Sequence, residues 1–366
     1  MTSRSHFFLL LALLGMTGGL GQWWMYRRGL AFLQPKWTLA FFLLLPLIFI
    51  LPYLFSDMLP RSVTKTFAWI GGYWLIFFYY SVLLLLLYAA FYALCLLLQQ
   101  HSLWQLAAGK LACAGFFLIW TAIAWGNWNA FHPVYREVAV VTEKPLPREL
   151  TVAFASDIHL GAILGSDYSE TLARRLQAAQ PDLILLGGDL IDGDLPFVMR
   201  DGSYENLAKF HAPLGVFAVY GNHDYLGADL PAQAKLFGNI RFLQDETIRI
   251  ADGLTLTGLD DYIYGKKTQP PQTTAQEAAF HILLDHEPWR ILAASEAGYD
   301  LYLAGHTHAG QFFPNRLATK KLYALDYGSK HFGDMLAVVS NGYGFWGAPV
   351  RIGPPPEIVL LRLQNK

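Results

Sequence analysis

The stretch Gly305-His306-Thr307-His308 and the earlier stretch Ser156-Asp157-Ile158-His159 decide the fold of this chain. Each carries two side chains that can bind a metal ion, two residues apart. In extended backbone, residues i and i+2 lie on the same face, so we expect each stretch to direct two ligands at one point. Gly187-Gly188-Asp189 and Gly221-Asn222-His223-Asp224 stand between them, and all four stretches follow apolar, strand-like runs. The pattern predicts a hydrolase built around metal ions.

Charged residues are unevenly distributed along the 366 residues. The chain is 54% hydrophobic and 15% charged, whereas soluble proteins carry about 25% charged residues. Residues 1–130 contain seven basic residues and one acidic residue, Asp57, so the remainder carries −7 to give the net charge of −1. We therefore expect an apolar membrane region at 1–130 and a water-soluble domain at 131–366. The sequence has no basic patch, so no nucleic-acid partner is expected.

The first 130 residues contain four apolar runs, each consistent with a helix that crosses the hydrocarbon core of a membrane. They cover about residues 6–24, Thr38–Phe55, Phe67–Leu98 and about Leu103–Trp125. Tryptophan residues near the ends of these runs are typical of the membrane–water interface. We expect an α-helical bundle in a multi-pass protein of the cell membrane. Charged residues are scarce inside the runs, which argues against a transporter.

Basic residues next to the runs predict the orientation of the soluble domain. With four spans, the side that carries this domain has Arg4, Arg61, Lys65, Arg136, Lys144 and Arg148. The other side has Arg27, Arg28, Lys36 and Lys110. The positive-inside rule therefore predicts a cytoplasmic catalytic domain.

In the soluble domain, short apolar runs alternate with helical patterns. We expect strands at Arg136–Val141, Thr151–Ala155, Leu183–Leu186, Val216–Tyr220, Ile240–Leu243, Thr247–Ile250, Leu254–Leu259, His281–Leu284, Leu301–Ala304, Leu336–Ser340 and Glu357–Leu363. We expect helices at Ser169–Ala179, Tyr204–Phe210, Pro231–Phe237 and Thr274–Phe280. Continuous apolar runs indicate strands that are covered on both faces, so the pattern predicts an α/β domain with sheets inside and helices outside.

Five ordered blocks resemble the calcineurin-like metallophosphoesterase family. They are Asp157-x-His159, Gly188-Asp189, Gly221-Asn222-His223-Asp224, His286 and Gly305-His306-x-His308. The ending, with Gly342-Tyr343-Gly344, Pro349-Val350-Arg351 and Pro355-Pro356-Glu357-Ile358, resembles the bacterial membrane-associated branch, which is similar to transmembrane metallophosphoesterase-domain proteins. The resemblance implies a four-layer αββα sandwich of two mixed sheets, with two divalent metal ions at the strand ends.

The resemblance also implies which residues bind the two ions. Asp157, His159 and His308 would hold one ion, Asn222, His286 and His306 would hold the other, and Asp189 would bridge both. Two ions held in this way can stabilise both the attacking and the leaving oxygens at phosphorus. The mixed imidazole, carboxylate and amide ligands suit manganese, iron, zinc or cobalt better than magnesium.

His223 lies next to a predicted ligand and is the expected catalytic residue. There it would stabilise the phosphoryl group or protonate the leaving oxygen. Asp192 and Asp224 are candidates to orient histidines from behind the ligands. Asp194 is either such a partner or a solvated loop charge.

Differences from two related classes of phosphatase narrow the range of expected substrates. Purple acid phosphatases place a tyrosine three residues after the bridging aspartate, where this chain has Asp192. Protein serine/threonine phosphatases carry phosphate-gripping arginines where this chain has Tyr220 and Gly193. We therefore expect hydrolysis of a phosphodiester or pyrophosphate bond. The resemblance implies a lipid-linked substrate such as UDP-2,3-diacylglucosamine.

The alternative is a non-catalytic membrane sensor or scaffold that retains the metal-binding fold. Its expected mark is an eroded ligand set, and the blocks above show no erosion.

Overall fold

The computed structural model describes residues 3–55, 58–226, 229–273 and 279–366. The chain forms two compact units. The first contains Met1–Trp128 together with the short segment Gly347–Val350, and the second contains Asn129–Trp346 and Arg351–Lys366. The predicted helix at Thr274–Phe280 falls largely on residues 274–278, which lie outside the described part of the chain.

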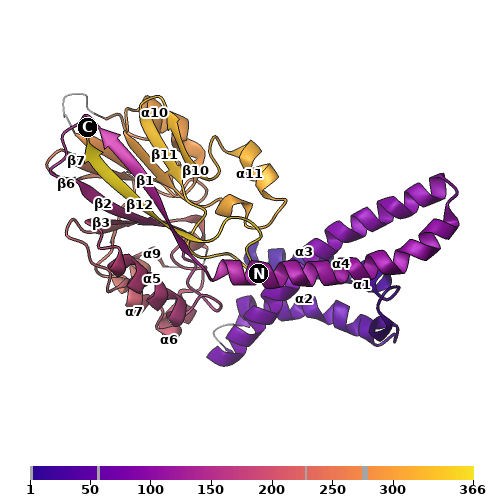
Figure 1. Ribbon diagram of the computed structural model, residues 1–366. Helices are drawn as coiled ribbons and strands as arrows, with labels where there is room; N and C mark the ends of the chain where they lie inside the picture. Colours follow the sequence, from indigo (N-terminus) through magenta and orange to yellow (C-terminus); the bar gives the residue numbers. More distant parts are fainter. Residues whose placement is uncertain (1–2, 56–57, 227–228, 274–278) are drawn as a thin grey trace. The chain divides into compact units, whose positions relative to one another are not determined.

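The first unit is built from long apolar helices (Figure 1). They are α1 (Ser3–Tyr26), α2 (Thr38–Phe55), α3 (Arg61–Leu97) and α4 (His101–Ala130), with a short 3₁₀ turn at Ala31–Leu33. Among the described residues, α3 and α4 are long and apolar enough to cross a membrane. The other two helices form at the other two predicted runs, and the count of four spans stays a prediction.

Small residues let these helices approach closely. A Cβ atom on Gly71 of α3 would lie 2.5 Å from the Cα atom of Phe49 in α2, so no larger side chain fits there. Glycines at helix contacts are characteristic of packing without water, where backbones gain from close approach. Polar contacts add specificity, since Tyr26 Oη of α1 lies 2.8 Å from Ser81 Oγ of α3.

The second unit contains two six-stranded sheets. The first has the order β1-β12-β2-β3-β4-β5, and the second has the order β10-β11-β9-β8-β7-β6. The strands of the first sheet are β1 (Val134–Thr142), β2 (Leu150–Ala155), β3 (Leu183–Gly187), β4 (Val216–Val219), β5 (Arg241–Phe242) and β12 (Glu357–Asn365). Those of the second are β6 (Glu246–Ala251), β7 (Leu254–Gly258), β8 (Phe280–Leu284), β9 (Leu301–Ala304), β10 (Gly328–Phe332) and β11 (Met335–Val339).

Both sheets are mixed. In the first, β2 to β5 are parallel, and β12 pairs antiparallel with β2 and parallel with β1. In the second, β7, β8, β9 and β11 are parallel, while the edge strands β6 and β10 run antiparallel to their neighbours. The parallel strands therefore present their carboxyl ends at shared sheet edges.

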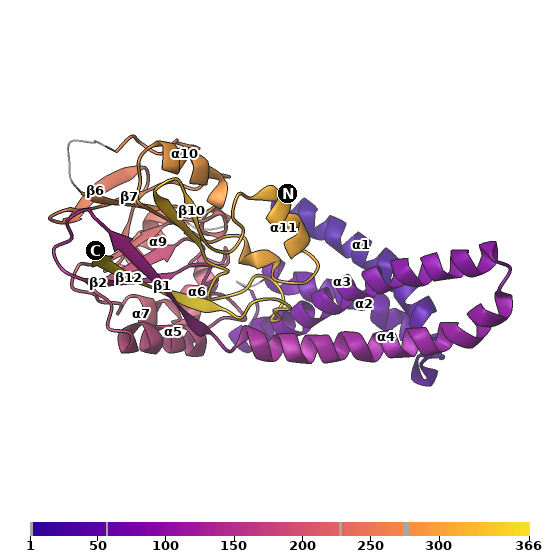
Figure 2. The same ribbon diagram turned by 45° about the horizontal axis from the view of Figure 1, so that its top comes forward.

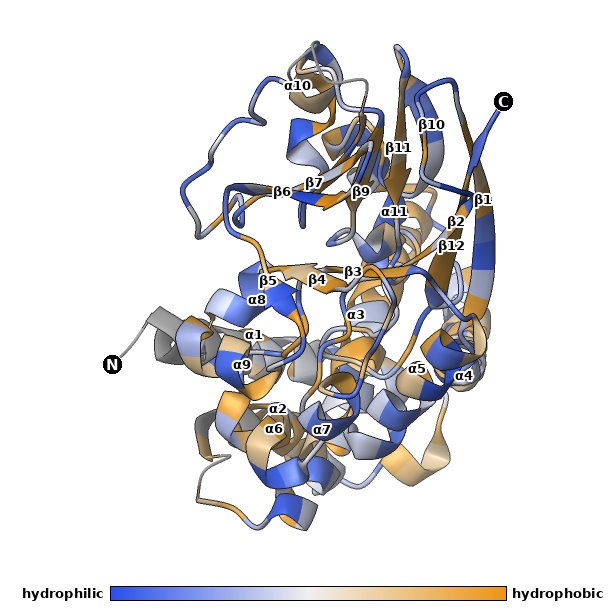
Figure 3. Ribbon diagram, turned by 90° about the vertical axis from the view of Figure 1, so that its left-hand side faces the viewer, coloured by the Kyte–Doolittle hydropathy of each residue, from blue (hydrophilic) through white to orange (hydrophobic). Residues whose placement is uncertain are grey.

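The sheets pack face to face with helices outside. Phe154 and Leu185 of the first sheet share a buried cluster with Ile282 and Leu303 of the second. Figure 3 shows β3, β4 and β5 facing β6, β7 and β9 across this apolar layer. Stacking of the two sheets buries the inward-facing residues of the central strands.

Helices cover the outer faces of both sheets. The helices of this unit are α5 (Ser166–Ala178), α6 (Leu195–Asp201), α7 (Tyr204–Leu207), α8 (Asn222–Tyr225), α9 (Leu230–Leu236), α10 (Ile291–Glu296) and α11 (Arg316–Leu322), with 3₁₀ turns at Pro288–Arg290 and His308–Gly310. Leu172 and Leu176 of α5, one turn apart on one face, pack on the first sheet. Ile291 of α10 packs on the second sheet. Figures 1 and 2 show α10 on one side of the sheets and α5 and α7 on the other. The predicted αββα sandwich is confirmed.

Candidate metal centre

All the predicted ligands lie just beyond the carboxyl ends of parallel strands. Asp157 and His159 follow β2, Asp189 follows β3, and Asn222 and His223 follow β4. In the second sheet, His286 follows β8, whereas His306 and His308 follow β9. Because strands of both sheets end here, residues as distant in sequence as 157 and 308 become neighbours.

One group of ligand atoms contains Asp157, His159 and His308, all buried. The Nε2 atoms of His159 and His308 lie 3.1 Å apart. His308 Nε2 lies 3.5 Å from Asp157 Oδ1, and His159 Nε2 lies 3.7 Å from Asp189 Oδ2. Two imidazole nitrogens that face each other inside a protein cannot both hold a proton without repulsion, so this arrangement fits a shared cation.

A second group adjoins the first through Asp189. His286 Nε2 lies 3.3 Å from Asp189 Oδ2 and 3.2 Å from Asn222 Oδ1. His306 Nδ1 lies 2.9 Å from the same Asn222 oxygen and 3.3 Å from His286 Nε2. The Asp189 Oδ2 atom therefore lies within 4 Å of a histidine from each group, as a bridging carboxylate requires.

The side chain of His286 is oriented for metal binding. Its Nδ1–H group donates a hydrogen bond of 2.7 Å to the carbonyl oxygen of Gly187. This leaves Nε2 directed at Asp189 and Asn222. Such a bond from the second nitrogen fixes the orientation of a ligating imidazole.

The backbone of the ligand residues differs from the expectation. We expected Asp157 with His159, and His306 with His308, to converge through extended backbone. Instead φ is +54° at Asp157, +51° at His159, +68° at His306 and +48° at His308, and Asp189 has φ of +52°. These residues stand beyond the strand ends, in the left-handed region that side chains other than glycine rarely adopt. The pairs converge, but the predicted reason was wrong.

Hydrogen bonds from neighbouring loops hold this unusual backbone. The His306 N–H donates to both carboxylate oxygens of Asp157 at 3.0 Å. The His159 N–H donates to the carbonyl of Asp189 at 2.9 Å, and the Asp157 N–H to that of Gly188 at 3.0 Å. Strained conformations persist only where surrounding structure fixes them, and they concentrate at functional sites.

Electrostatics favour neutral imidazoles at His159 and His306 and an anionic Asp189. Burial opposes protonation of His286, but Asp189 outweighs burial and raises the pKa of His286 well above its usual range. Burial lowers the pKa of His159 to about 4 and that of His306 to about 3, with neighbouring histidines adding to the effect. Burial opposes ionisation of Asp189, but His286 and His223 outweigh it and hold the pKa of Asp189 well below its usual range. Neutral imidazole and ionised carboxylate are the forms that bind metal ions.

His223 lies beside the first group. Its ring centroid is 4.8 Å from that of His159, and its backbone N–H donates to Asp189 Oδ1 at 2.8 Å. Asp192 Oδ1 lies 2.9 Å from His223 Nδ1. Burial lowers the pKa of His223, but Asp189 and Asp192 outweigh burial and raise it to about 9. A histidine that keeps its proton suits the general acid expected here.

The three candidate supporting aspartates have different roles. Asp192 orients His223, as expected. Asp224 accepts hydrogen bonds from the backbone of Leu190, Ile191 and Gly221, so it fixes ligand loops rather than a histidine. Asp194 accepts from the Phe197 N–H at 3.0 Å and caps the amino end of α6.

Sequence reasoning missed Arg351 as a partner of the centre. This arginine is fully buried, and its Nη2 lies 3.1 Å from His308 Nδ1. It also donates to the carbonyl oxygens of Asn341 and Gly344. Arg351 belongs to the ending that resembles the family branch, but no spacing pattern in the sequence connects this arginine with a histidine 43 residues away.

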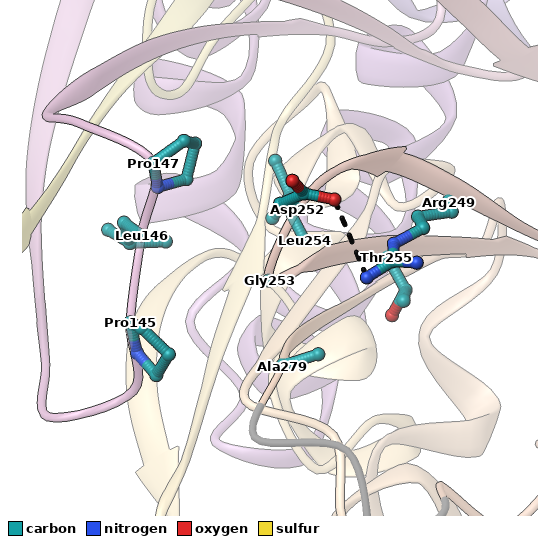
Figure 4. A pocket seen from close by; sticks show the side chains of 9 residues that line it. All are labelled: Pro145, Leu146, Pro147, Arg249, Asp252, Gly253, Leu254, Thr255 and Ala279. Atoms are coloured by element: carbon teal, nitrogen blue, oxygen red, sulfur yellow. Dashed lines mark ion pairs between the residues drawn. The ribbon is translucent and has the colours of Figure 1, made fainter.

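A hollow of about 400 Å³, separate from the candidate centre, lies at the amino end of β7, and Figure 4 shows the residues that line it. It is lined by Pro145, Leu146, Pro147, Arg249, Asp252, Gly253, Leu254, Thr255 and Ala279. Leu254 begins β7, whose carboxyl end lies on the side of the candidate centre. The charged groups of the hollow form an exposed ion pair, with 3.5 Å between Arg249 Nη2 and Asp252 Oδ1. None of the side chains predicted to bind metal lines this hollow, whereas all of them lie beyond the carboxyl ends of the strands.

An αββα sandwich with histidines and carboxylates converging at its strand ends defines a class of metal-dependent hydrolases. Residues 150–310 match the family model described as calcineurin-like phosphoesterase. An uncharacterized metallophosphoesterase of Helicobacter pylori is 33% identical over 273 residues, which cover 69% of this chain and 70% of the relative. The chain therefore belongs to the calcineurin-like metallophosphoesterase family, whose members are metal-dependent hydrolases with a dimetal centre.

Two further proteins are similar. A transmembrane protein with metallophosphoesterase domain from Bos taurus is 31% identical over 250 residues, which cover 62% of this chain and 56% of the relative. Among solved structures, a dimetal phosphatase from Danio rerio covers 53% of this chain and 87% of its own, with 13% identity and a TM-score of 0.34. The latter likeness is too distant to support an argument.

Proposed function

We propose that this protein is a membrane-attached phosphoesterase that uses two metal ions to hydrolyse a phosphodiester or pyrophosphate bond of a lipid-linked substrate. One observation carries the proposal. Asp189 Oδ2 lies 3.7 Å from His159 Nε2 and 3.3 Å from His286 Nε2, between two groups of metal-binding atoms.

The proposed ligands follow from these groups. One ion is assigned to Asp157, His159 and His308, the other to Asn222, His286 and His306, and Asp189 to both. When bound, such ions lower the pKa of water and stabilise charge that develops on oxygens at phosphorus. The ligand types suit manganese, iron, zinc or cobalt.

His223 is proposed as the general acid. Its Nδ1 atom faces Asp192 at 2.9 Å, which leaves Nε2 for the substrate. Its side chain is 15% exposed, so a bound substrate can reach it. Protonation of the leaving oxygen from Nε2 would avoid expulsion of an unstabilised alkoxide or phosphate.

The residues at the arginine positions of protein phosphatases support a diester or pyrophosphate substrate. Tyr220 is 3% exposed and its ring stacks on Phe242 with centroids 4.5 Å apart. Gly193, at φ of +70°, offers no side chain at all. Neither residue can grip the two charged oxygens of a phosphate monoester as an arginine does.

The apolar helices support a substrate in the membrane. Helices α3 and α4 are each suited to cross a bilayer, and the relative from Bos taurus is described as a transmembrane protein. We place residues 1–130 in the membrane as four spans and residues 131–366 as the catalytic domain on the cytoplasmic side. An enzyme held in this way meets lipid-linked molecules at high local concentration.

The test compares substrates for the purified full-length protein with manganese. We expect faster hydrolysis of lipid-linked pyrophosphates than of a soluble diester, and no hydrolysis by the Asp189→Ala variant. Equal rates of hydrolysis for both substrates would refute the preference for a lipid-linked substrate. A protein that binds no metal and stays inactive with manganese or zinc would refute the enzyme and favour a scaffold.

A further inference from the structure

The helical unit contains a hollow of about 790 Å³ between the end of α1 and the first half of α4. It is lined by Arg28, Gly29, Trp104, Gln105, Leu106, Ala108, Gly109, Lys110, Cys113 and Ala114. The set combines two cationic side chains and one amide with apolar side chains. The metal centre uses none of these residues.

Contact between two glycines brings the cationic residues together. A Cβ atom on Gly29 would collide with the carbonyl oxygen of Gly109, and one on Gly109 would lie 2.9 Å from the carbonyl oxygen of Arg28. The two backbones therefore touch. Arg28 and Lys110 each adjoin one of these glycines, and both line the hollow.

Aromatic rings orient the guanidinium of Arg28. It lies 4.2 Å from the ring centroid of Trp24 and 5.8 Å from that of Trp104. The Trp104 ring is itself packed against Tyr88 and Tyr92, with centroids 4.8 Å and 4.7 Å away. Stacking on the faces of these rings leaves the N–H groups at the edge of the guanidinium available for an anion.

No carboxylate of the helical unit balances these charges in the described part of the chain. The one acidic residue in the first 130, Asp57, lies outside the described residues. Neither Arg28 nor Lys110 forms an ion pair there. Arg28 and Lys110 are both exposed and lie beside Leu106 and Ala114 at the end of apolar helices, so they are placed to attract a negative charge from outside the helical unit.

We propose that this hollow binds the headgroup phosphate of an anionic phospholipid. Arg28 and Lys110 would contact the phosphate oxygens, the Gln105 amide would bond the polar headgroup, and Leu106 and Ala114 would contact the first methylenes. Tryptophans and basic residues together mark the headgroup level of a membrane. Basic hollows between membrane helices recognise acidic lipid headgroups in this way. The inference rests on the membrane attachment in the proposed function, but not on catalysis.

The experiment measures lipid bound to the full-length protein by native mass spectrometry. Protein in detergent is titrated with phosphatidylglycerol, with phosphatidylcholine or with inorganic phosphate. We expect one saturable phosphatidylglycerol site and weaker binding of the zwitterionic lipid. Arg28→Gln and Lys110→Gln should each weaken phosphatidylglycerol binding about fivefold, since one cation near a lipid surface contributes about that factor. The charge-preserving Arg28→Lys variant should bind more tightly than Arg28→Gln but more weakly than wild type, because lysine keeps the charge and loses the stacked guanidinium.

Arg27→Gln is the matched control. Arg27 also lies over a tryptophan, 4.4 Å from the Trp23 centroid, but it does not line the hollow. Equal loss of binding in Arg27→Gln and Arg28→Gln would assign the effect to general surface charge and overturn the site. Displacement of the lipid by millimolar inorganic phosphate would overturn the lipid assignment. Because bound lipid is measured directly, an inactive protein still tests this site, so its failure is distinct from failure of the phosphoesterase.

Discussion

Replacement of Asp224 should lower both the thermal stability of the protein and its metal content, because this side chain supports the ligand loops. Its buried carboxylate accepts from four N–H donors, of Leu190 at 3.1 Å, Ile191 at 3.1 Å, Gly221 at 2.9 Å and Gln233 at 2.7 Å. Leu190 and Ile191 directly follow Asp189, and Gly221 directly precedes Asn222. One side chain therefore connects two loops that carry proposed ligands.

Asp224→Ala would leave these four donors buried without an acceptor. A buried donor left without an acceptor costs about 1–3 kcal/mol, so the loss of all four bonds is expected to cost roughly 4 kcal/mol or more. For a domain of this size, that loss lowers the thermal midpoint by about 10 °C. Asp224→Asn can keep the acceptor for Leu190, Ile191 and Gln233 and lose mainly the Gly221 bond, so we expect a smaller loss of about 1–3 kcal/mol.

The assay is thermal unfolding of the full-length protein in detergent after chelation, together with metal content by mass spectrometry. Asp194→Ala is the control, because that side chain caps a helix away from the ligands. It should cost about 1 kcal/mol and leave metal content unchanged. A midpoint for Asp224→Ala within 2 °C of wild type, roughly the least shift that 1 kcal/mol produces, would refute the reasoning. Full metal content in that variant would refute the proposed link between the two loops.

Three further variants test the centre. Asp189→Ala should reduce bound metal from two ions to at most one and abolish turnover; two ions per chain in elemental analysis would contradict the bridging role. His223→Ala should keep its metal and lose about 10²–10⁴-fold in rate; loss of metal would show that His223 is a ligand. Gly305→Ala should lower metal content, because its Cβ would collide with Ser156 Oγ and Asp157 Oδ2; wild-type metal content would show that the loop can move aside.

An α/β domain with buried sheets was predictable because its strands are continuous apolar runs, whereas the four-layer sandwich was implied by the family resemblance. Thr151–Ala155 and Leu183–Leu186 were expected as strands, and they form β2 and β3. Such runs need two covered faces, which favours sheets inside and helices outside. The strand Gly328–Phe332 was not expected, since this edge strand is partly exposed and its sequence lacks an apolar run.

The ligand positions were predictable in part, but their local geometry was not. The blocks lie after the strands that carry them, as expected. The left-handed backbone at His306 arises from hydrogen bonds to Asp157, 149 residues away. The contact of Arg351 with His308 also depends on tertiary structure. Neither feature has a local sequence signal, because both result from partners that only the folded chain brings close.

The left-handed backbone at five of the proposed ligands has an evolutionary consequence. Each such residue without glycine's freedom destabilises the native state by about 1–3 kcal/mol. Replacement of His159, His306 or His308 by glycine would relieve that strain. Without a need to bind metal ions, such replacements would be favoured. A lineage that had abandoned ion binding would thus be expected to lose these bulky side chains early. The five left-handed residues therefore carry a stability cost that the proposed ion binding would have to offset.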